Sequence, residues 1–245
     1  MRNIKLIIEY DGTDFSGWQI QKDQRTVQET IEKELRVILG EKVKLTGSGR
    51  TDSGVHAKAL VANFKAKSGI TVEKIKKALN ARLPQDVAII DVQLAPMNFN
   101  ARFSAKSKVY RYTINNGSSR VAINRQYVCR LPYRLDVNLM KKEAAVLIGR
   151  KNFKSFHASG RKLENFKRHL KRIDIKKYKN GFITVDIEAD GFLYNMVRNI
   201  VGTLVEVGRG KLPAGSTKKI LAYKNRQCAG PTMPAKGLCL LEVKY

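Results

Sequence analysis

Residues 182–187, Phe-Ile-Thr-Val-Asp-Ile, alternate apolar and polar side chains and are followed by an apolar stretch at residues 192–205, Phe-Leu-Tyr-Asn-Met-Val-Arg-Asn-Ile-Val-Gly-Thr-Leu-Val. The alternation predicts a strand with Ile183, Val185 and Ile187 on one face. The second stretch has so little polar surface that it predicts a buried helix. Together the two stretches indicate a fold that combines strands and helices.

The rest of the chain continues this succession of strands and helices. Thr26 and Glu29 predict a capping box at the start of the first helix, and Gly40 predicts its left-handed end. The segment 95–100 is the expected boundary, which gives an N-terminal α/β half at 1–97 and a C-terminal α/β half at 98–245. The expected strands are 4–10, 43–45, 59–64, 87–92 and 109–114, and the other expected helices are 27–39, 72–83 and 137–148.

The charge of the chain points to a polyanionic partner. Its 245 residues include 47 Lys and Arg against 21 Asp and Glu, a formal charge of +26. The cations recur along the whole chain, so the folded body is expected to carry a positive surface, and an ordinary domain with a basic tail is excluded. With 43% hydrophobic and 28% charged residues, the composition is that of a globular protein.

Several classes of protein fit this sequence badly. No uncharged apolar run approaches the ~18 residues of a spanning helix, so no membrane is expected. Glu9 and Asp11 follow the first apolar run too soon for a signal peptide, so we expect a cytoplasmic location. The three cysteines are far apart without a Cys-x-x-Cys pair, and the three histidines lack metal-ligand spacing. We therefore expect no metal.

Chemistry is expected in the glycine-rich stretch 47–56, Gly-Ser-Gly-Arg-Thr-Asp-Ser-Gly-Val-His. Its glycines favour a tight turn that exposes Arg50 and Asp52. A phosphate-binding loop would need a lysine that is missing here, and an aspartic protease would need a second such loop. A structural alternative remains open, in which Asp52 only caps a turn and Arg50 only faces solvent.

Two residues of the second half are further candidates. Arg198 lies within the apolar helix, where a buried guanidinium needs a carboxylate partner. Asp52 is one candidate, because a nearby arginine keeps a nucleophilic aspartate ionised, but another acid or solvent would serve equally well. Tyr110 shares a strand face with Tyr112, so it is either a core aromatic or a ring on which a flipped base stacks.

At these residues the sequence resembles the tRNA pseudouridine synthase A family, whose members act on the anticodon stem-loop. The Arg-Thr-Asp loop combined with the Met-Val-Arg helix at this separation is a specific match. The similarity extends nearly from end to end, through residues 10–13, 17–19, 26–28, 49–57, 99–105, 110–112, 191–194, 196–204 and 207–210.

The resemblance implies the pseudouridine synthase fold, an α+β fold in which two similar α/β halves with mixed, largely antiparallel sheets join across a central cleft. It implies an isomerase that detaches uracil from its ribose, turns it and rejoins it through carbon, without cofactor or metal. The implied partner is tRNA, modified at positions 38, 39 and 40 and held by a homodimer. A non-catalytic RNA-binding protein and a hydrolase that activates water with Asp52 remain alternatives.

The resemblance also implies roles for individual residues. Asp52 would be the nucleophile that attacks the sugar or the base, and Arg198 would hold it ionised. Tyr110 would stack on the target uracil, and Arg50 would fill the space that the flipped uridine leaves. The implied RNA contacts are Phe99, Asn100, Ala101, Arg102, Phe103, Arg161 and Lys162, although Gly-Arg-Lys-Leu at 160–163 departs from the Ser-Arg-Thr-like run more usual in the family.

Overall fold

The chain forms two units in the computed structural model, which describes residues 1–158 and 163–245. The first unit consists of Met1–Lys106 and Cys239–Tyr245, and the second is Ser107–Leu238. The division therefore falls later than the boundary expected at residue 97, and the last residues return to the first unit. This return could not be expected from the sequence, because it depends on the pairing of Cys239 and Leu240 with His56 and Ala57, far away in the chain.

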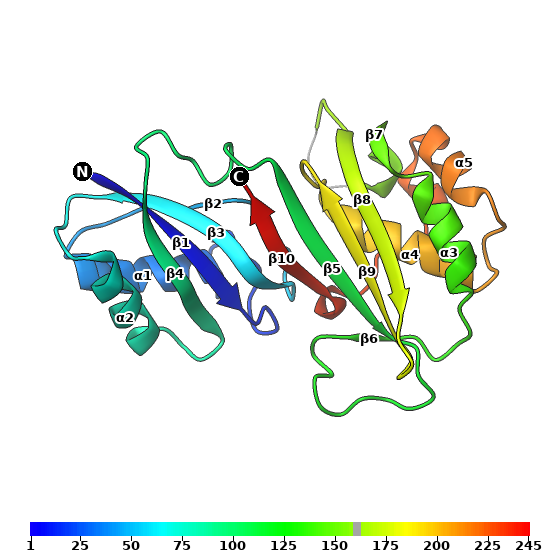
Figure 1. Cartoon of the computed structure of the whole chain (residues 1–245), viewed down its shortest axis with the longest axis horizontal. Helices are drawn as coiled ribbons and strands as arrows, with labels where there is room; N and C mark the ends of the chain where they lie inside the picture. Colours follow the sequence, from blue (N-terminus) through cyan, green and yellow to red (C-terminus); the bar gives the residue numbers. More distant parts are fainter. Residues whose placement is uncertain (159–162) are drawn as a thin grey trace. The chain divides into compact units, whose positions relative to one another are not determined.

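The first unit is a sheet with two helices on one face (Figure 1). The strands have the order β4-β1-β3-β10, with β1 antiparallel to both neighbours and β10 parallel to β3, while the short β2 pairs with β3. The register places Leu6 opposite Ala62, and both side chains are buried. The elements are β1 (Arg2–Tyr10), α1 (Val27–Leu39), β2 (Thr46–Gly47), β3 (His56–Ala66), α2 (Val72–Arg82), β4 (Val87–Ala95) and β10 (Leu238–Lys244).

Two expectations for the first unit are wrong. Thr26 lies at the start of α1, but its hydroxyl has no hydrogen-bond partner among the described residues. The carbonyl of Trp18 accepts the amide of Gln28 instead, at 3.0 Å, so the preceding loop replaces the cap. The strand expected at 43–45 is irregular, and pairing begins only at β2. The left-handed end of α1 at Gly40, with φ 68°, is confirmed.

The second unit is also a sheet covered by helices on one face (Figure 1). Its strands have the antiparallel order β5-β9-β8-β7, and the short β6 pairs in parallel with β5. The predicted α+β class with mixed, largely antiparallel sheets is therefore confirmed. The elements are β5 (Ser107–Asn115), β6 (Cys129–Arg130), α3 (Val137–Ala145), β7 (Gly149–Asn152), η1 (Lys154–Phe156), β8 (Lys167–Lys177), β9 (Phe182–Ala189), α4 (Met196–Gly208), α5 (Ser216–Tyr223), η2 (Arg226–Cys228) and η3 (Ala235–Gly237).

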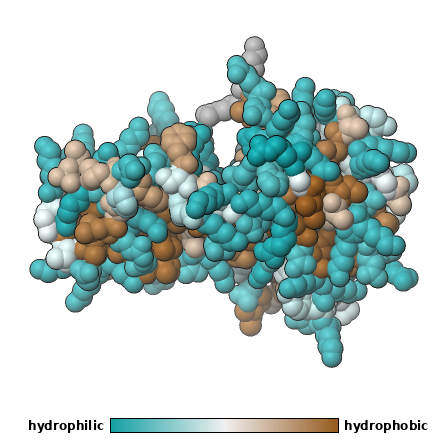
Figure 2. Space-filling model, turned by 45° about the horizontal axis from the view of Figure 1, so that its top comes forward, coloured by the Kyte–Doolittle hydropathy of each residue, from teal (hydrophilic) through white to brown (hydrophobic). Residues whose placement is uncertain are grey.

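Hydrophilic residues cover most of the face shown in Figure 2.

The core of each unit lies between its sheet and its helices. In the second unit, nearly all side chains of α4 are buried in this core. Within the described parts of the chain, no helix is both long and apolar enough to cross a membrane.

Glu143 connects two helices of the second unit. It lies on α3, is 6% exposed, and accepts hydrogen bonds from the amides of Gly215 at 2.6 Å and Thr217 at 2.9 Å, at the start of α5. Burial opposes ionisation of this carboxyl, but the hydrogen bonds from Gly215 and Thr217 outweigh it and hold the pKa below its ordinary value of 4.5. The carboxylate therefore stabilises the fold above that value, and this contribution is lost as the pH falls through the lower, folded pKa.

We expect Glu143→Gln to lower the free energy of unfolding by about 1–3 kcal/mol at neutral pH, because an amide cannot accept both hydrogen bonds. The difference from the unsubstituted protein should shrink as the pH falls below about 4.5. Urea unfolding at several pH values measures both effects. Glu242→Gln, at an exposed site on β10, is the matched control. A pH-independent difference would contradict the role of the ionised carboxylate.

Candidate active site

The Asp52 loop, residues 47–56, leads from β2 into β3. The carbonyl of Asp52 accepts the amide of Val55 at 3.2 Å, and Gly54 between them has φ 74°. A glycine with positive φ as the third of the four turn residues is the signature of a type II turn. Residues other than glycine rarely adopt this conformation. Val55 is buried and anchors the turn, whereas Asp52 is partly exposed and Arg50 exposed. The turn thus presents the Asp52 carboxylate from a fixed backbone.

A second loop supports the Asp52 loop through backbone contacts. A Cβ placed on Gly12 would lie 2.1 Å from the carbonyl oxygen of Val55, and one on Gly17 would lie 2.5 Å from that of Thr51. Gly17 also has φ 96°, a conformation that favours glycine. The glycines of the Tyr-Asp-Gly-Thr and Gly-Trp-Gln motifs are therefore explained by close backbone approach rather than by chemistry.

Two aromatic residues complete this support. A Cβ on Gly47 would lie 2.6 Å from Nε1 of Trp18, so the backbone at Gly47 rests directly on the buried indole. The Tyr10 hydroxyl lies 2.8 Å from Oγ1 of Thr51, next to Asp52 in the chain. Tyr10 and Trp18 have no role in the hypothesis drawn from the sequence, although the nearby Gly12 and Gly17 are a signal of close packing.

Tyr110 lies on β5 in the second unit. It is 7% exposed, and its ring meets Phe192 edge to face, with 5.1 Å between ring centroids and 83° between planes. Such a contact is favourable for aromatic pairs. The structure therefore gives Tyr110 the packed surroundings of a core aromatic, and its stacking on a base stays a prediction.

Arg198 is held at the start of α4 and is partly exposed. Its Nε donates to the carbonyl of Met233 at 2.6 Å, and its Nη1 donates to Oδ1 of Asn195 at 2.7 Å. Asn195 has φ 57°, so the chain turns left-handed just before the helix, and α4 begins later than residue 192, where the helix was expected. Two hydrogen bonds to different nitrogens fix the plane of the guanidinium. Asp52 belongs to the first unit, so its pairing with Arg198 is a proposal.

A polar network beside Arg198 is absent from the sequence-based hypothesis. Asn199 is fully buried, and its Oδ1 accepts from Arg226 Nη2 at 3.0 Å and from the Thr232 hydroxyl at 2.6 Å. An asparagine within an apolar helix was the available signal, because buried polar groups are nearly always hydrogen-bonded.

The loop 99–103 of the first unit is anchored by the C-terminal residue. The Tyr245 ring packs at a tilt against Phe99, with 5.0 Å between centroids, and its hydroxyl donates to the carbonyl of Ala101 at 2.8 Å. Ala101 is fully buried. Phe99 and Ala101 thus position the loop and its exposed neighbours, and contact of the loop with RNA stays a prediction.

Those exposed neighbours are Arg102 and Phe103, the latter 78% exposed. Asn100 orders them, because its Oδ1 accepts both of their amides, at 2.9 and 3.1 Å. Arg161 and Lys162, the other expected RNA contacts, lie outside the described residues.

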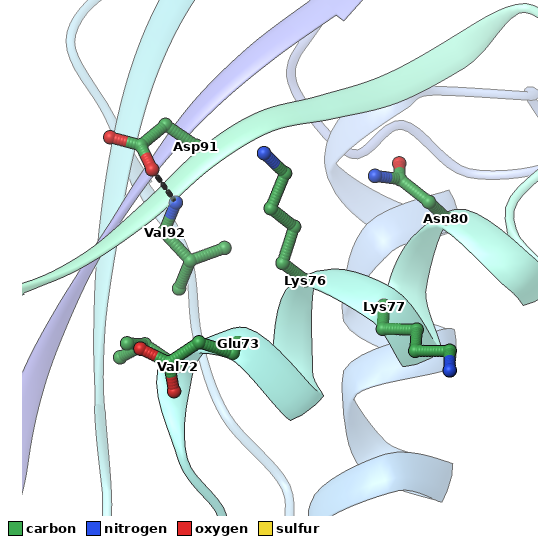
Figure 3. A pocket seen from close by; sticks show the side chains of 7 residues that line it. All are labelled: Val72, Glu73, Lys76, Lys77, Asn80, Asp91 and Val92. Carbon is green, nitrogen blue, oxygen red and sulfur yellow. Dashed lines mark hydrogen bonds between the residues drawn. The ribbon is translucent and has the colours of Figure 1, made fainter.

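A pocket between α2 and β4 is lined by Lys76, Asn80, Asp91 and neighbouring residues, none of which belongs to the predicted site (Figure 3). The Asp91 carboxylate there accepts the amide of Val92 at 2.9 Å. Across residues 1–158 and 163–245, no group of three or more His, Cys, Asp or Glu side chains could hold a metal ion.

Known proteins are similar to this chain over its whole length. A family model described as tRNA pseudouridine synthase matches residues 6–104 and 144–245. The tRNA pseudouridine synthase A of Acetivibrio thermocellus is 44% identical over 245 residues, and that of Clostridium botulinum strain Eklund 17B is 46% identical over 245 residues, in both cases with all of each chain covered.

Among solved structures, a Cbf5–Nop10–Gar1 complex matches with a TM-score of 0.38 and 11% identity, covering 96% of this chain and 57% of that one. The assignment depends on the family model and on the full-length relatives. Both matches cover residues 47–56 of this chain and the start of α4. The chain belongs to the tRNA pseudouridine synthase family.

Proposed function

We propose that this protein isomerises uridine to pseudouridine in the anticodon stem-loop of tRNA, at positions 38, 39 and 40, with Asp52 as the nucleophile. The observation that carries the proposal is the Asp52 loop, in which a glycine-dependent turn presents a carboxylate from a backbone held by Gly12 and Gly17. Membership of the family supports the reaction.

The reaction needs no net exchange of atoms or electrons. The Asp52 carboxylate forms a bond to the anomeric carbon or to the base, and the bond between ribose carbon and uracil nitrogen breaks. A carbon of the turned ring then bonds to the ribose, and the bond to Asp52 breaks, which restores the free carboxylate. The proton on that ring carbon leaves, and the released nitrogen gains one. Arg198 keeps the carboxylate ionised, Tyr110 stacks on the uracil, and Arg50 fills the vacated space.

Binding of tRNA follows from the charge of +26, since cations that contact phosphates release counterions. We also propose that the protein is a homodimer that holds one tRNA across both subunits. Its proposed location is the cytoplasm. Sedimentation with and without tRNA measures the number of subunits in the complex.

Incubation with an unmodified tRNA transcript, followed by carbodiimide mapping, tests the function. We expect new pseudouridine at positions 38 to 40 and an unchanged RNA mass. Absence of product at protein concentrations that saturate binding would favour a non-catalytic RNA-binding protein. Release of free uracil or nicked RNA would identify a hydrolase.

Phe103→Ala is expected to weaken tRNA binding by roughly 5- to 150-fold, because stacking of a base on an aromatic ring contributes about 1–3 kcal/mol. The dissociation constant at one fixed salt concentration measures the effect. Tyr223→Ala, which removes another exposed aromatic ring from α5, is the control. Equal affinities of the two variants would contradict an RNA contact by Phe103.

A further inference from the structure

Residues 229–237, here called the strap, run beside α4 in the second unit, through the turn η3. The strap and the helix touch backbone to backbone. A Cβ on Gly202 would lie 1.8 Å from the carbonyl oxygen of Pro231, and one on Gly230 would lie 2.7 Å from the carbonyl carbon of Gly202. The Gly230 amide donates to the buried hydroxyl of Thr203 at 2.9 Å. Only glycine permits this separation, so strap and helix have little freedom to shift.

Arg226 holds the first end of the strap. Its Nη1 donates to the carbonyls of Ala229 at 3.2 Å and Gly230 at 2.9 Å, and its Nη2 donates to Thr232 Oγ1 and Asn199 Oδ1, both at 3.0 Å. Burial lowers the pKa of Arg226. An arginine retains its charge in proteins, and four neutral oxygens compensate here for the lost water. One guanidinium thus ties three points of the strap to α4.

Tyr112 holds the other end. Its side chain is fully buried on β5, and its hydroxyl donates to the carbonyl of Pro234 at 2.8 Å. A Cβ on Gly237 would lie 2.6 Å from Cζ of the Tyr112 ring, so the strap also rests on the ring itself. Burial, and then the neighbouring Cys129, raise the pKa of Tyr112. The hydroxyl therefore stays a hydrogen-bond donor at any pH used for assay.

Met233 lies between these two attachments. Its carbonyl accepts Nε of Arg198 at 2.6 Å, and its amide donates to the Arg198 carbonyl at 3.4 Å. On one side of Met233, Thr232 donates to Asn199, and on the other side, Pro234 accepts from Tyr112. The oxygen that orients the guanidinium is therefore fixed from both directions along the chain.

We propose that the strap sets the orientation of Arg198 at the reacting uridine, and that Tyr112 and Arg226 act through it as positioning residues of the isomerase. This inference rests on the proposed function. A displacement of about 1 Å at a reacting group can cost up to about a hundredfold in rate, so fixing the Met233 carbonyl matters to catalysis as well as to folding. A strap that served folding alone would leave the catalytic parameters unchanged in any variant that still folds.

Tyr112→Phe and Thr232→Val test the inference, since each removes one hydroxyl from one end of the strap and keeps the shape of the side chain. We expect kcat for pseudouridine formation to fall roughly five- to tenfold in each, the effect of losing about one hydrogen bond, with KM nearly unchanged. The acidic limb of the pH profile of kcat should move to higher pH, because a displaced Arg198 stabilises ionised Asp52 less.

Tyr178→Phe, which removes a hydroxyl from a 45% exposed ring of the same unit, should alter neither kcat nor the profile. Arg226→Lys keeps the charge but loses the fork of donors, so it should lower kcat further than either hydroxyl variant. Thermal unfolding identifies any variant that is not folded at the assay temperature. If Arg226→Lys is not folded there, the kcat values of Tyr112→Phe and Thr232→Val alone test the inference.

The inference is overturned if Tyr112→Phe and Thr232→Val are folded and have the kcat and the pH profile of the unsubstituted protein. It is also overturned if only the unfolding temperature changes. An unsubstituted protein that binds tRNA but forms no pseudouridine would overturn the proposed function, and the strap inference with it. Activity of the unsubstituted protein together with unaffected variants would overturn the strap inference alone.

Discussion

Asp52→Asn is expected to lower the rate of pseudouridine formation by on the order of 10⁴-fold or more, while the affinity for tRNA stays within about threefold. Asparagine has nearly the same shape, but its neutral amide is not a nucleophile, and loss of a nucleophile is among the most costly changes in an enzyme. The turn should survive, because the carbonyl of residue 52 and the glycine at 54 form it. Single-turnover assays with labelled tRNA, alongside binding measurements, give both quantities.

The control for Asp52→Asn is Asp23→Asn, which makes the same change of charge at an exposed residue of the first unit. Asp23 has φ 57°, and asparagine tolerates that conformation as well as aspartate does. Its rate of pseudouridine formation should equal that of the unsubstituted protein. Retention of substantial activity by Asp52→Asn would exclude Asp52 as the nucleophile, whatever the family membership.

Arg198→Lys is the substitution with the second largest expected effect. We expect kcat to fall by roughly 10²- to 10³-fold, about 3–4 kcal/mol, a loss typical for one preorganised donor in an active site. Lysine keeps the charge, but it cannot donate along the directions that Met233 and Asn195 fix for the guanidinium. The acidic limb of the pH profile should move to higher pH, as a less stabilised Asp52 carboxylate requires.

Arg111→Lys is the matched control for Arg198→Lys. Arg111 lies next to Tyr110 on β5 and binds Asp186 through two nitrogens, each at 2.7 Å. The same exchange there removes a forked contact that is not assigned to the reaction, so it should change stability but not kcat. If Arg198→Lys changes only stability, as the control does, Arg198 is a structural residue and Asp52 needs another partner.

Elements with a strong local signal are the ones that the sequence predicts well. Helix α1 lies where its apolar positions and Gly40 place it, because helix periodicity and a left-handed cap are local properties. By contrast, the sequence does not predict β10 of the first unit or the basic β8 of the second. In β8 the apolar side chains are few among the cations, and the register with β9 shifts between Leu170 and Arg172, so the alternation is broken in the sequence.

The candidate site shows the same division. Asp52, Arg198 and Tyr110 follow from sequence motifs, because residue types and spacing can be compared with a family. The contacts that hold those residues do not follow from motifs. Thr26 loses its capping role to a carbonyl of the preceding loop, and Arg226 meets Asn199 only once α4 and the strap have packed together.

By itself, the sequence of this protein determined the class of partner, the mixture of strands and helices, and the residues to which chemistry is assigned, since charge, periodicity and motif spacing are properties of the chain. Tertiary structure alone decided which glycines permit backbone to approach backbone, at Gly12 beneath the Asp52 loop and at Gly202 beneath the strap. It also decided which carbonyl orients Arg198. These features depend on distances of a few ångströms between segments far apart in the chain, and such distances exist only after the elements have packed.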